Sequence, residues 1–315
     1  MRIAVFGAGG IGGYLGGRLS QAGEEVVLIA RGEHLKAIRE HGLRVDSIKG
    51  DFVATPALAT ENPTEAGKVD AVILGVKAWQ VAAAAEAMRP MIGPNTFVLP
   101  LQNGVEATAQ LASVLGDQAV VVGMGGIVSY IVGPGHIRHA GVDPFVTFGE
   151  ADDSTSERTQ DLLQAFLKAN VRANIPTNVY AELWGKLAYM ATTSGIGAIT
   201  RVPISQWRNV PGSWEMAQQV VREVLAVAAG RGIEMPGDAL DSMIARLESS
   251  TTGMTTSMQR DLMEGRPSEL EVHNGAVVRL GLEVGVPTPV NAFIYHSLLP
   301  QEMKARGEIQ PKEAE

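Results

Sequence analysis

The first twelve residues restrict the fold of this chain more than any other segment. Residues 3–6 form a short apolar run typical of a buried parallel strand, and Gly7, Gly9 and Gly12 follow in G-x-G-x-x-G order before a helix-forming stretch. This spacing permits a tight turn, close approach of a pyrophosphate to the backbone, and a helix that lies directly on the strand. We therefore predict a dinucleotide-binding loop made of Gly7, Ala8, Gly9, Gly10, Ile11 and Gly12.

A purely structural glycine turn is the alternative explanation of this motif. A second strand-like run at residues 25–30, at the distance expected for a Rossmann-type fold, favours the dinucleotide site. NAD sites usually place an Asp or Glu at the end of this second strand, but residues 26–30 contain no acid and Arg31 follows directly. Because a guanidinium can bind the oxygens of a 2′-phosphate in pairs, we predict NADP(H) as the cofactor. A solvated surface arginine is the alternative for Arg31.

Composition excludes several classes of protein. The chain has 315 residues, enough for two domains, and its net charge of −8 gives no general attraction to nucleic acid or to an anionic membrane. It contains no run of eighteen apolar residues and no signal-peptide pattern, so we expect a cytoplasmic protein without a membrane partner. The absence of cysteine excludes disulfides and thiolate sites, and the six histidines lack metal-ligand spacing, so we expect no metal site.

The order of the expected elements indicates an α/β fold: an N-terminal Rossmann-type domain followed by an all-α C-terminal domain. Strand and helix patterns alternate up to Pro176, after which only helical patterns remain, so we predict an NADP-binding domain at 1–176 and a helical substrate and catalytic domain at 177–315. The expected strands after residue 30 are 43–46, 52–54, 69–74, 97–101, 120–132, 135–139, 145–148 and 171–175, with the added strands at 120–148 antiparallel. The expected helices include 31–41, 154–169, 179–193, 214–229, 238–247, 267–282 and 289–305.

Two polar residues follow buried strands of the first domain. Lys77 follows the strand at 69–74, and Asn103 follows the strand at 97–101. Ligands bind at the carboxyl ends of parallel strands, so Lys77 is expected to reach a cofactor phosphate or ribose and Asn103 a carboxamide or carbonyl group. A helix-start lysine and an ordinary Asn-Gly turn are the respective alternatives.

The first helix of the second domain carries a candidate acid. Glu182, Lys186, Met190 and Ser194 are spaced by four and share a helix face that drifts slowly around the axis. Lys186 has apolar sequence neighbours, and partial loss of hydration lowers the pKa of an ammonium from about 10.4 toward a range useful for general acid catalysis. We expect the reaction in the cleft between the two domains. A snorkelling surface lysine is the alternative.

The sequence resembles the ketopantoate reductases (2-dehydropantoate 2-reductases), which are NADPH-dependent. The resemblance covers nearly the whole chain and depends on the glycine motif, Arg31, Lys77-Ala78-Trp79-Gln80, Leu101-Gln102-Asn103-Gly104, Leu183-Trp184-Gly185-Lys186-Leu187, Ser257-Met258-Gln259-Arg260-Asp261, Glu269 with Asn274-Gly275, and Thr288-Pro289-Val290-Asn291.

The resemblance implies a role for each of these site residues. Lys186 is the implied proton donor, Asn103 contacts cofactor and keto acid, Ser257 binds substrate, and Glu269 completes the catalytic and cofactor site. A nearby ammonium would stabilise the charge that gathers on the ketone oxygen, and the hydroxyls near Ser257 would favour a substrate carboxylate. A helix cap is the alternative for Ser257, and a solvated first-turn acid is the alternative for Glu269. The implied partner is a small keto acid, and the resemblance is compatible with a homodimer.

The chain departs from the family in one respect that concerns the substrate. The family typically has asparagines four and eight residues after its lysine, whereas here Met190 and Ser194 occupy these substrate-binding positions. A methionine cannot donate a hydrogen bond to a hydroxyl, so the substrate is either 2-dehydropantoate or a less polar ketone or keto acid. A non-catalytic NADPH sensor and a β-hydroxyacid or imine-forming dehydrogenase are the remaining alternatives.

Overall fold

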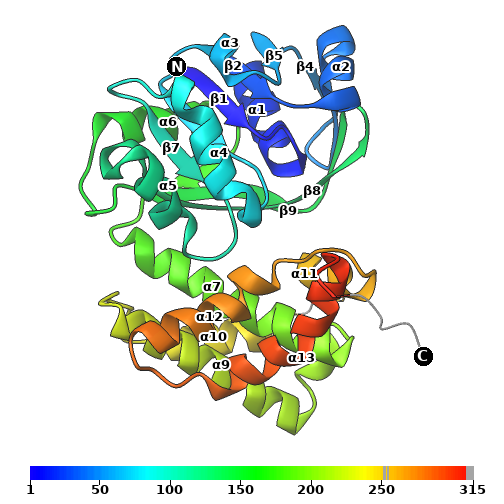
Figure 1. The fold of residues 1–315 in the computed structure, drawn as a ribbon, viewed down its shortest axis with the longest axis vertical. Coiled ribbons are helices and arrows are strands. Elements are labelled where there is room, and N and C mark those ends of the chain that lie inside the picture. Colours follow the sequence, from blue (N-terminus) through cyan, green and yellow to red (C-terminus); the bar gives the residue numbers. More distant parts are fainter. Residues whose placement is uncertain (251–252, 254, 310–315) are drawn as a thin grey trace. The chain divides into compact units, whose positions relative to one another are not determined.

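The apolar run at the start of the chain is the central strand of a parallel sheet in the computed structural model, which describes residues 1–250, 253 and 255–309 (Figure 1). The strands lie in the order β5-β2-β1-β6-β7, and every neighbouring pair is parallel. The strands are β1 (Arg2–Phe6), β2 (Glu25–Ile29), β5 (Leu58–Thr60), β6 (Ala71–Leu74) and β7 (Phe97–Pro100). This arrangement confirms the predicted Rossmann-type fold, although the three-residue strand β5 was not expected.

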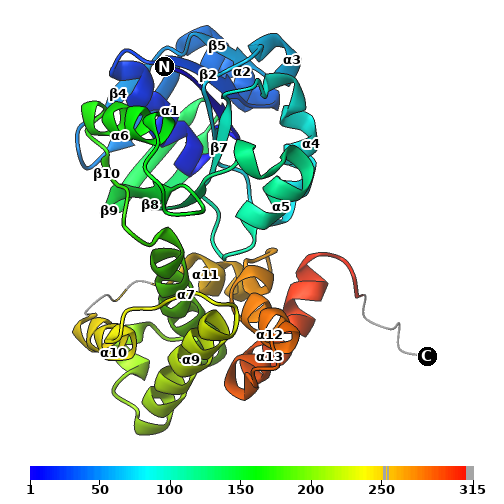
Figure 2. The ribbon, with the colours of Figure 1, turned by 90° about the vertical axis from the view of Figure 1, so that its left-hand side faces the viewer.

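Helices cover both faces of this sheet. Side chains alternate along β1, so Ile3 and Val5 enter the core that includes α1, while Ala4 and Phe6 enter the core that includes α4. Figure 2 shows α1 on one side of the strands and α4 and α5 on the other. These helices and the neighbouring ones are α1 (Gly10–Gln21), α2 (Gly32–His41), α3 (Pro63–Ala66), α4 (Val81–Met88) and α5 (Ala107–Leu115).

A second sheet lies against the outer side of α1. It consists of β10 (Arg172–Asn174), β9 (His136–Gly149), β3 (Leu43–Ser47) and β4 (Phe52–Ala54), with β8 (Val122–Gly133) paired to β9 and with α6 (Glu157–Lys168) before β10. The helix fits between two sheets because its glycines leave no side chain in the way: Gly16 faces Val5 and Leu28 of the first sheet, and Gly17 faces Phe52 of the second.

The structure corrects the expectation for residues 135–148. One continuous strand, β9, replaces the two strands expected at 135–139 and 145–148, because the ladder with β8 continues across a register shift between Gly126 and Val128. The antiparallel expectation holds for β8 with β9. It is wrong for β9 with β3 and β10, which are parallel pairs.

From residue 179 onward, the described residues form helices and the turns between them, as predicted. The helices are α7 (Val179–Thr200), α8 (Ile204–Trp207), α9 (Pro211–Gly230), α10 (Ala239–Ser249), α11 (Ser257–Met263), α12 (Asn274–Glu283) and α13 (Pro289–Ala305). Three boundaries differ by three residues or more, the first being that of α9, which begins at Pro211 and not at the expected Trp214. Helix α7 continues seven residues beyond 193, where Gly195 and Gly197 pack against the side chains of Asn274 and Gln259. The helix expected at 267–282 begins only at Asn274, after a 3-10 turn (Leu270–Val272).

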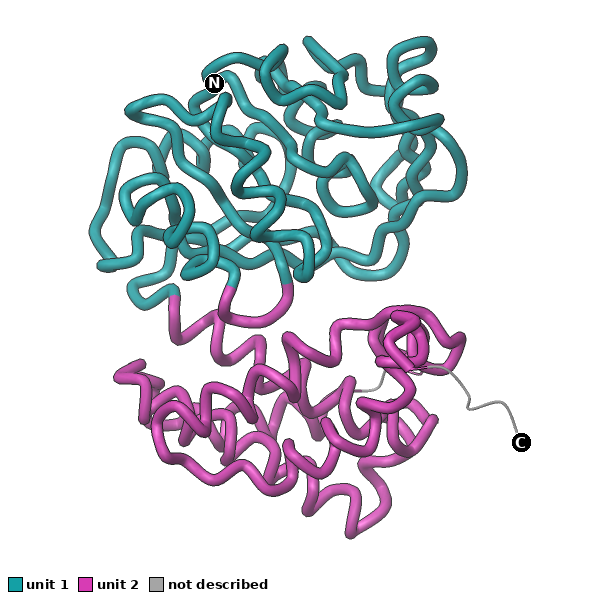
Figure 3. Tube along the Cα trace, viewed as in Figure 1, with its two compact units in different colours: residues 1–102, 107–179 teal, residues 103–106, 180–315 magenta. Residues whose placement is uncertain are grey.

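By their contacts, the residues form two compact units (Figure 3). The first contains residues 1–102 and 107–179, and the second contains residues 103–106 and 180–315. The loop 103–106, which includes Asn103, thus belongs with the helices rather than with the sheet that precedes it. None of the described helices combines the length and the apolar character needed to cross a bilayer.

Candidate active site

The glycine loop (residues 7–12) has the geometry that a pyrophosphate requires. Gly7 has a φ of +100°, and a Cβ at Gly12 would overlap the carbonyl oxygen of Gly7. Within the described part of the chain, no atom lies within 4 Å of the position that a Cβ at Gly9 would take. The backbone can therefore approach a ligand at Gly9, beside the exposed N–H groups at the start of α1. These observations fit the predicted dinucleotide.

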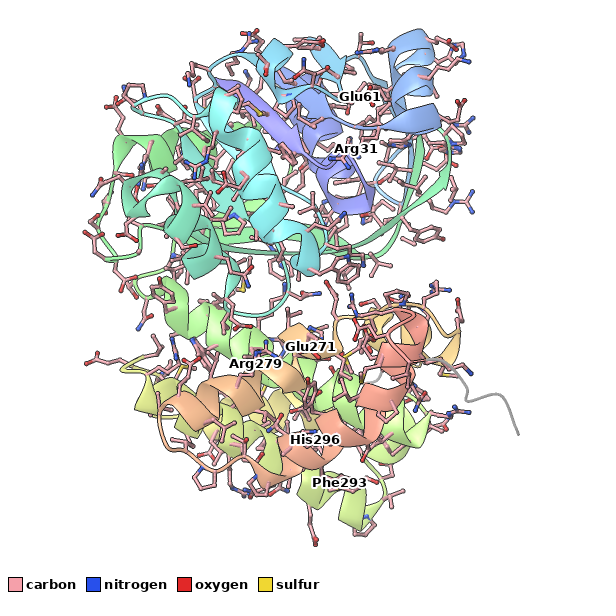
Figure 4. All side chains as sticks on the ribbon, viewed as in Figure 1. Arg31, Glu61, Glu271, Arg279, Phe293 and His296 are labelled. Carbon is pink, nitrogen blue, oxygen red and sulfur yellow. The ribbon has the colours of Figure 1, made fainter. Side chains whose placement is uncertain are left out.

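Arg31 lies just after β2, at the edge of the sheet where dinucleotide folds contact the ribose of the adenosine. It is the N-cap of α2, directly after Ala30 at the carboxyl end of β2, and its side chain is exposed (Figure 4). The backbone N–H of Ala30 donates to the carbonyl of Thr60 over 3.0 Å, so Glu61 follows β5 at the same edge of the sheet. This edge of the sheet thus carries the Arg31 cation and the Glu61 carboxylate.

Lys77 follows β6 in a loop that Gln102 holds in place. The side-chain amide of Gln102 donates to the carbonyls of Leu74 and Val76 over 2.9 and 3.0 Å. Lys77 is exposed, and its Nζ lies 5.8 Å from the centre of the Trp79 ring. Because β6 and β2 both neighbour β1, Lys77 and Arg31 stand at the same carboxyl edge of the sheet on either side of the glycine loop.

In the second unit, Lys186 is a half-buried cation in an apolar part of α7. Its sequence neighbours Trp184 and Leu187 are only 3% and 2% exposed. Burial lowers the pKa of Lys186 from 10.5 to about 8, although the carboxylate of Glu269 acts in the opposite direction and raises it. The pKa shift has the direction predicted from the sequence. At neutral pH, Lys186 is charged and holds a proton that it can release readily.

Glu269 and Asn103 form the polar partner of Lys186. Asn103 Nδ2 donates to Glu269 Oε2 over 2.8 Å, and Glu269 is 8% exposed. The loop of Asn103 also packs closely against the 3-10 turn that follows Glu269. A Cβ at Gly104 would come within 2.8 Å of the Val272 carbonyl oxygen. The structure thus brings together three of the predicted site residues: Asn103, Lys186 and Glu269.

Two ion pairs of Arg279 connect the other end of this loop, at Glu106, to Glu271. Arg279 Nη2 lies 3.0 Å from Glu106 Oε2, and Arg279 Nη1 lies 2.8 Å from Glu271 Oε2, in a pair labelled in Figure 4. Tyr295 donates its hydroxyl to Glu271 Oε1 over 2.7 Å, and burial together with Glu271 raises the pKa of Tyr295 to about 12. Tyr295 therefore stays neutral and acts as a donor.

His273 is a site residue that the sequence interpretation missed. It is 0% exposed, and within the described residues neither ring nitrogen has a hydrogen-bond partner. Burial lowers the pKa of His273 from 6.5 to about 4, with Glu269 raising it and Lys186 lowering it. The imidazole is therefore neutral beside the Lys186–Glu269 pair. The signal that could have found it is the four-residue spacing from Glu269.

The two residues that replace the family's asparagines differ in burial. Met190 is half-buried, whereas Ser194 is fully buried, and among the described residues its Oγ has no hydrogen-bond partner. The four-residue spacing turns the side chains about 40° per step around the helix axis, which carries the later positions toward the core. Substrate contact by Met190 and Ser194 stays a prediction.

Ser257 is the first residue of α11 and is half-buried. The residue that caps this helix is Thr256, whose hydroxyl accepts from the backbone N–H of Gln259 over 3.2 Å. The alternative function of Ser257 as a helix cap is therefore wrong. Its role in substrate binding stays a prediction. Among the described residues, no three His, Asp or Glu side chains gather in a way that could hold a metal ion.

Two protein-family models match this chain. A model described as ketopantoate reductase PanE/ApbA matches residues 3–153, and one described as its C terminal part matches residues 178–302. A 2-dehydropantoate 2-reductase from Mesorhizobium japonicum is 31% identical and covers 92% of this chain and 94% of its own length.

Solved structures show the same similarity. A PanE/ApbA family ketopantoate reductase from Ralstonia eutropha has a TM-score of 0.87 and 32% identity, covering 97% of this chain and 100% of its own. A D-mandelate dehydrogenase in complex with NADH and anilino(oxo)acetate also has a TM-score of 0.87, with 26% identity, covering 97% of this chain and 99% of its own.

Proposed function

Because the chain belongs to the ketopantoate reductase family, we propose that it reduces a 2-keto acid to the 2-hydroxy acid, with 2-dehydropantoate as the substrate and pantoate as the product. The protein is an NADP-dependent oxidoreductase that acts on CH–OH groups. The observation that best supports keto acid reduction is the half-buried Lys186, with its pKa lowered to about 8 beside Glu269.

We further propose that the first unit holds the cofactor. The glycine loop would bind the pyrophosphate, because Gly9 is open to a ligand and Gly12 lets α1 approach. Arg31 would bind the 2′-phosphate, with Lys77 as a second cation at the same edge of the sheet. When bound there, NADPH would supply the hydride that reduces the ketone carbon.

The second unit would supply the proton. As the carbonyl carbon is reduced, negative charge develops on its oxygen, and the Lys186 ammonium stabilises this charge and transfers its proton to the oxygen. Glu269 keeps Lys186 charged at neutral pH by raising its pKa against the effect of burial. Lys186 then recovers a proton from water before the next turnover. The amide of Asn103, oriented by Glu269, would donate or accept at the cofactor and the keto acid.

Ser257 would bind the substrate carboxylate together with the N–H groups at the start of α11. The acid would then be oriented by its carboxylate at Ser257 and polarised at its carbonyl by Lys186. The sensor alternative is less well supported, because cofactor binding alone does not require a lysine with a lowered pKa beside a carboxylate.

A second substrate class has a specific observation in its favour. Met190 stands one helical turn after Lys186, is half-buried, and cannot form the hydrogen bond that an asparagine would offer to a substrate hydroxyl. The similar D-mandelate dehydrogenase shows that the same fold serves an aromatic 2-hydroxy acid. A less polar 2-keto acid is therefore the alternative substrate.

A steady-state assay of NADPH oxidation tests both proposals. The panel contains 2-dehydropantoate, pyruvate, a branched aliphatic 2-keto acid and an aromatic 2-keto acid, each with NADPH and with NADH. The highest kcat/KM with 2-dehydropantoate and NADPH supports the proposed function. A higher kcat/KM with the aromatic or branched acid supports the alternative substrate, and no turnover above background with any 2-keto acid contradicts keto acid reduction.

A further inference from the structure

We propose that Glu302, in the last turns of α13, is a positioning residue that fixes the backbone turn at residues 268–274 and thereby holds Glu269 in its place beside Asn103 and Lys186. This inference rests on the proposed function of that site. Glu302 lies 33 positions after Glu269 and is only 1% exposed. The turn between Ser268 and Asn274 is called the catalytic turn below.

Glu302 and Arg306 bind all the polar groups of Ser268 at the start of the catalytic turn. The carboxylate of Glu302 accepts from the Ser268 N–H over 3.0 Å and from its hydroxyl over 2.6 Å. Arg306 donates to Glu302 Oε1 over 2.7 Å and to the Ser268 carbonyl over 3.1 Å. The Ser268 hydroxyl in turn accepts from the N–H of Leu270 over 3.2 Å, so both residues flanking Glu269 are fixed.

Helix α13 also holds the other end of the catalytic turn. Asn274 Nδ2 donates to Asn291 Oδ1 over 2.9 Å and to the carbonyl of Ala191 in α7 over 3.2 Å. Asn291 is itself fixed by the buried carboxylate of Glu223, which accepts from its N–H over 2.9 Å and from its side-chain amide over 2.8 Å. One helix therefore anchors both ends of the segment that carries Glu269.

These anchors determine a backbone shape that the local sequence does not favour. The pattern of residues 267–282 predicts one continuous helix, in which Glu269 would be a solvated residue of the first turn. In the structure, the N–H groups of Val272 and His273 both donate to the Glu269 carbonyl over 3.2 Å, and a 3-10 turn precedes α12. The hydrogen bonds from Ser268 to Glu302 therefore oppose the continuous helix. They keep Glu269 within hydrogen-bonding distance of Asn103.

A buried ion pair contributes little net stability, because the desolvation of its charges offsets their attraction. An apolar side chain at position 302 would avoid the desolvation of a carboxylate, and such replacements are often neutral or stabilising. Glu302 instead accepts directional bonds from the N–H and the hydroxyl of Ser268, in addition to its ion pair with Arg306, and these bonds fix a geometry. This supports a positioning role for the residue in addition to a structural one.

Glu302→Gln and Ser268→Ala test the proposal in the full-length protein. Both changes loosen the catalytic turn, and a misplaced Glu269 lowers kcat by about tenfold. The KM for NADPH changes much less than kcat, because the glycine loop and Arg31, which are proposed to bind the phosphates of NADPH, lie in the first unit. Both variants also move the alkaline limb of the pH–rate profile to lower pH, because a carboxylate that is less well placed raises the pKa of Lys186 less. The double variant is no slower than the slower single variant, since both changes break the same contact.

Glu150→Gln is the matched control. Glu150 is also a buried carboxylate, 8% exposed, and it accepts from Ser156 over 2.5 Å and from Arg158 over 2.6 and 2.7 Å, all within the first unit. This variant loses stability but keeps the wild-type pH–rate profile. The proposal is overturned if Glu302→Gln behaves in the same way, with a lower melting temperature and an unchanged profile.

A second measurement separates this inference from the proposed function. NMR of ¹³C-labelled lysine reports the pKa of Lys186 without any substrate. A lower Lys186 pKa in Glu302→Gln than in the wild type supports the positioning role even if no keto acid of the panel turns over, which would contradict only the proposed function. An unchanged Lys186 pKa contradicts the positioning role even if the wild type is an active reductase.

Discussion

Asn103 Nδ2 donates to Oε2 of Glu269 over 2.8 Å, although 166 positions separate the two residues in the sequence. The bond orients the amide of Asn103 and uses one oxygen of a carboxylate that also acts on Lys186. Asn103, which follows β7, is thereby fixed to the turn that carries Glu269. The charge of Glu269 is therefore expected to control the chemistry of this site.

Glu269→Gln should move the pH dependence of the reduction. Glu269 raises the pKa of Lys186 against the effect of burial, so its removal lowers this pKa below about 8. The reduction requires protonated Lys186, and its rate should therefore fall at a lower pH than in the wild type, in which it falls above about pH 8. The measurement is kcat/KM for the keto acid as a function of pH. Glu271→Gln, which alters the neighbouring pair with Arg279, should leave the alkaline limb in place.

His273→Leu should make the protein more resistant to acid. The pKa of His273 is about 4 when folded and 6.5 when unfolded, so the unfolded state binds more protons below about pH 6.5 and the wild type loses stability as the pH falls. This group alone costs about 2 kcal/mol between pH 7 and pH 5. Urea unfolding at these two pH values measures the difference.

The control for this experiment is an exposed histidine of the same unit. His296 stands on α13 and is labelled in Figure 4. His296→Gln should keep the wild-type loss of stability between pH 7 and pH 5. If His273→Leu loses as much stability as the wild type over this range, the imidazole is not buried in its neutral form and the description of His273 is wrong.

Arg31→Ala should weaken the preference for NADPH over NADH. Removal of a charged hydrogen-bonding partner of the 2′-phosphate should raise the KM for NADPH about tenfold to a hundredfold and leave the KM for NADH nearly unchanged. Arg89→Ala serves as the control, because Arg89 follows α4 and pairs with Glu86 at the amino-terminal edge of the sheet. Equal effects of Arg31→Ala on both cofactors would contradict the assignment of Arg31.

Met190→Asn should shift the substrate preference toward polar acids. The asparagine restores a hydrogen-bonding group one turn after Lys186, so kcat/KM for 2-dehydropantoate should rise about fivefold to tenfold. The value for an aromatic 2-keto acid should fall in the same variant, which provides the internal control. A parallel change for both substrates would show that residue 190 affects the enzyme generally and does not select the substrate.

The parts of this fold that the sequence predicted are those with local causes. The glycine loop, the apolar strand before it and the cation at Arg31 lie within one segment of the chain, and their spacing is set by a single turn and helix. The direction of the Lys186 pKa shift was also predictable, because its apolar neighbours are adjacent in the sequence.

The parts that were missed depend on distant contacts. The helix expected at 267–282 begins only at Asn274, and Ser268 before it is bound by Glu302, 34 positions away. Strand β9 runs on through a register shift at residues 141–144, because its pairing with β8 is present on both sides of the shift, at Ala140 and at Phe145. The neutral state of His273 depends on its complete burial, and the four-residue spacing from Glu269 could suggest the position of this residue but not its burial.

The most direct test of the account is the rate of NADPH oxidation by Lys186→Ala with the best 2-keto acid of the panel, together with the affinity for NADPH from the quenching of protein fluorescence. We expect kcat to fall about a thousandfold, because the general acid is lost, while NADPH binds as tightly as it does to the wild type. Lys168→Ala, at the end of α6 in the first unit, should match the wild type in both measurements. A Lys186→Ala enzyme that turns over the keto acid within a few-fold of the wild-type rate would contradict the proposed mechanism.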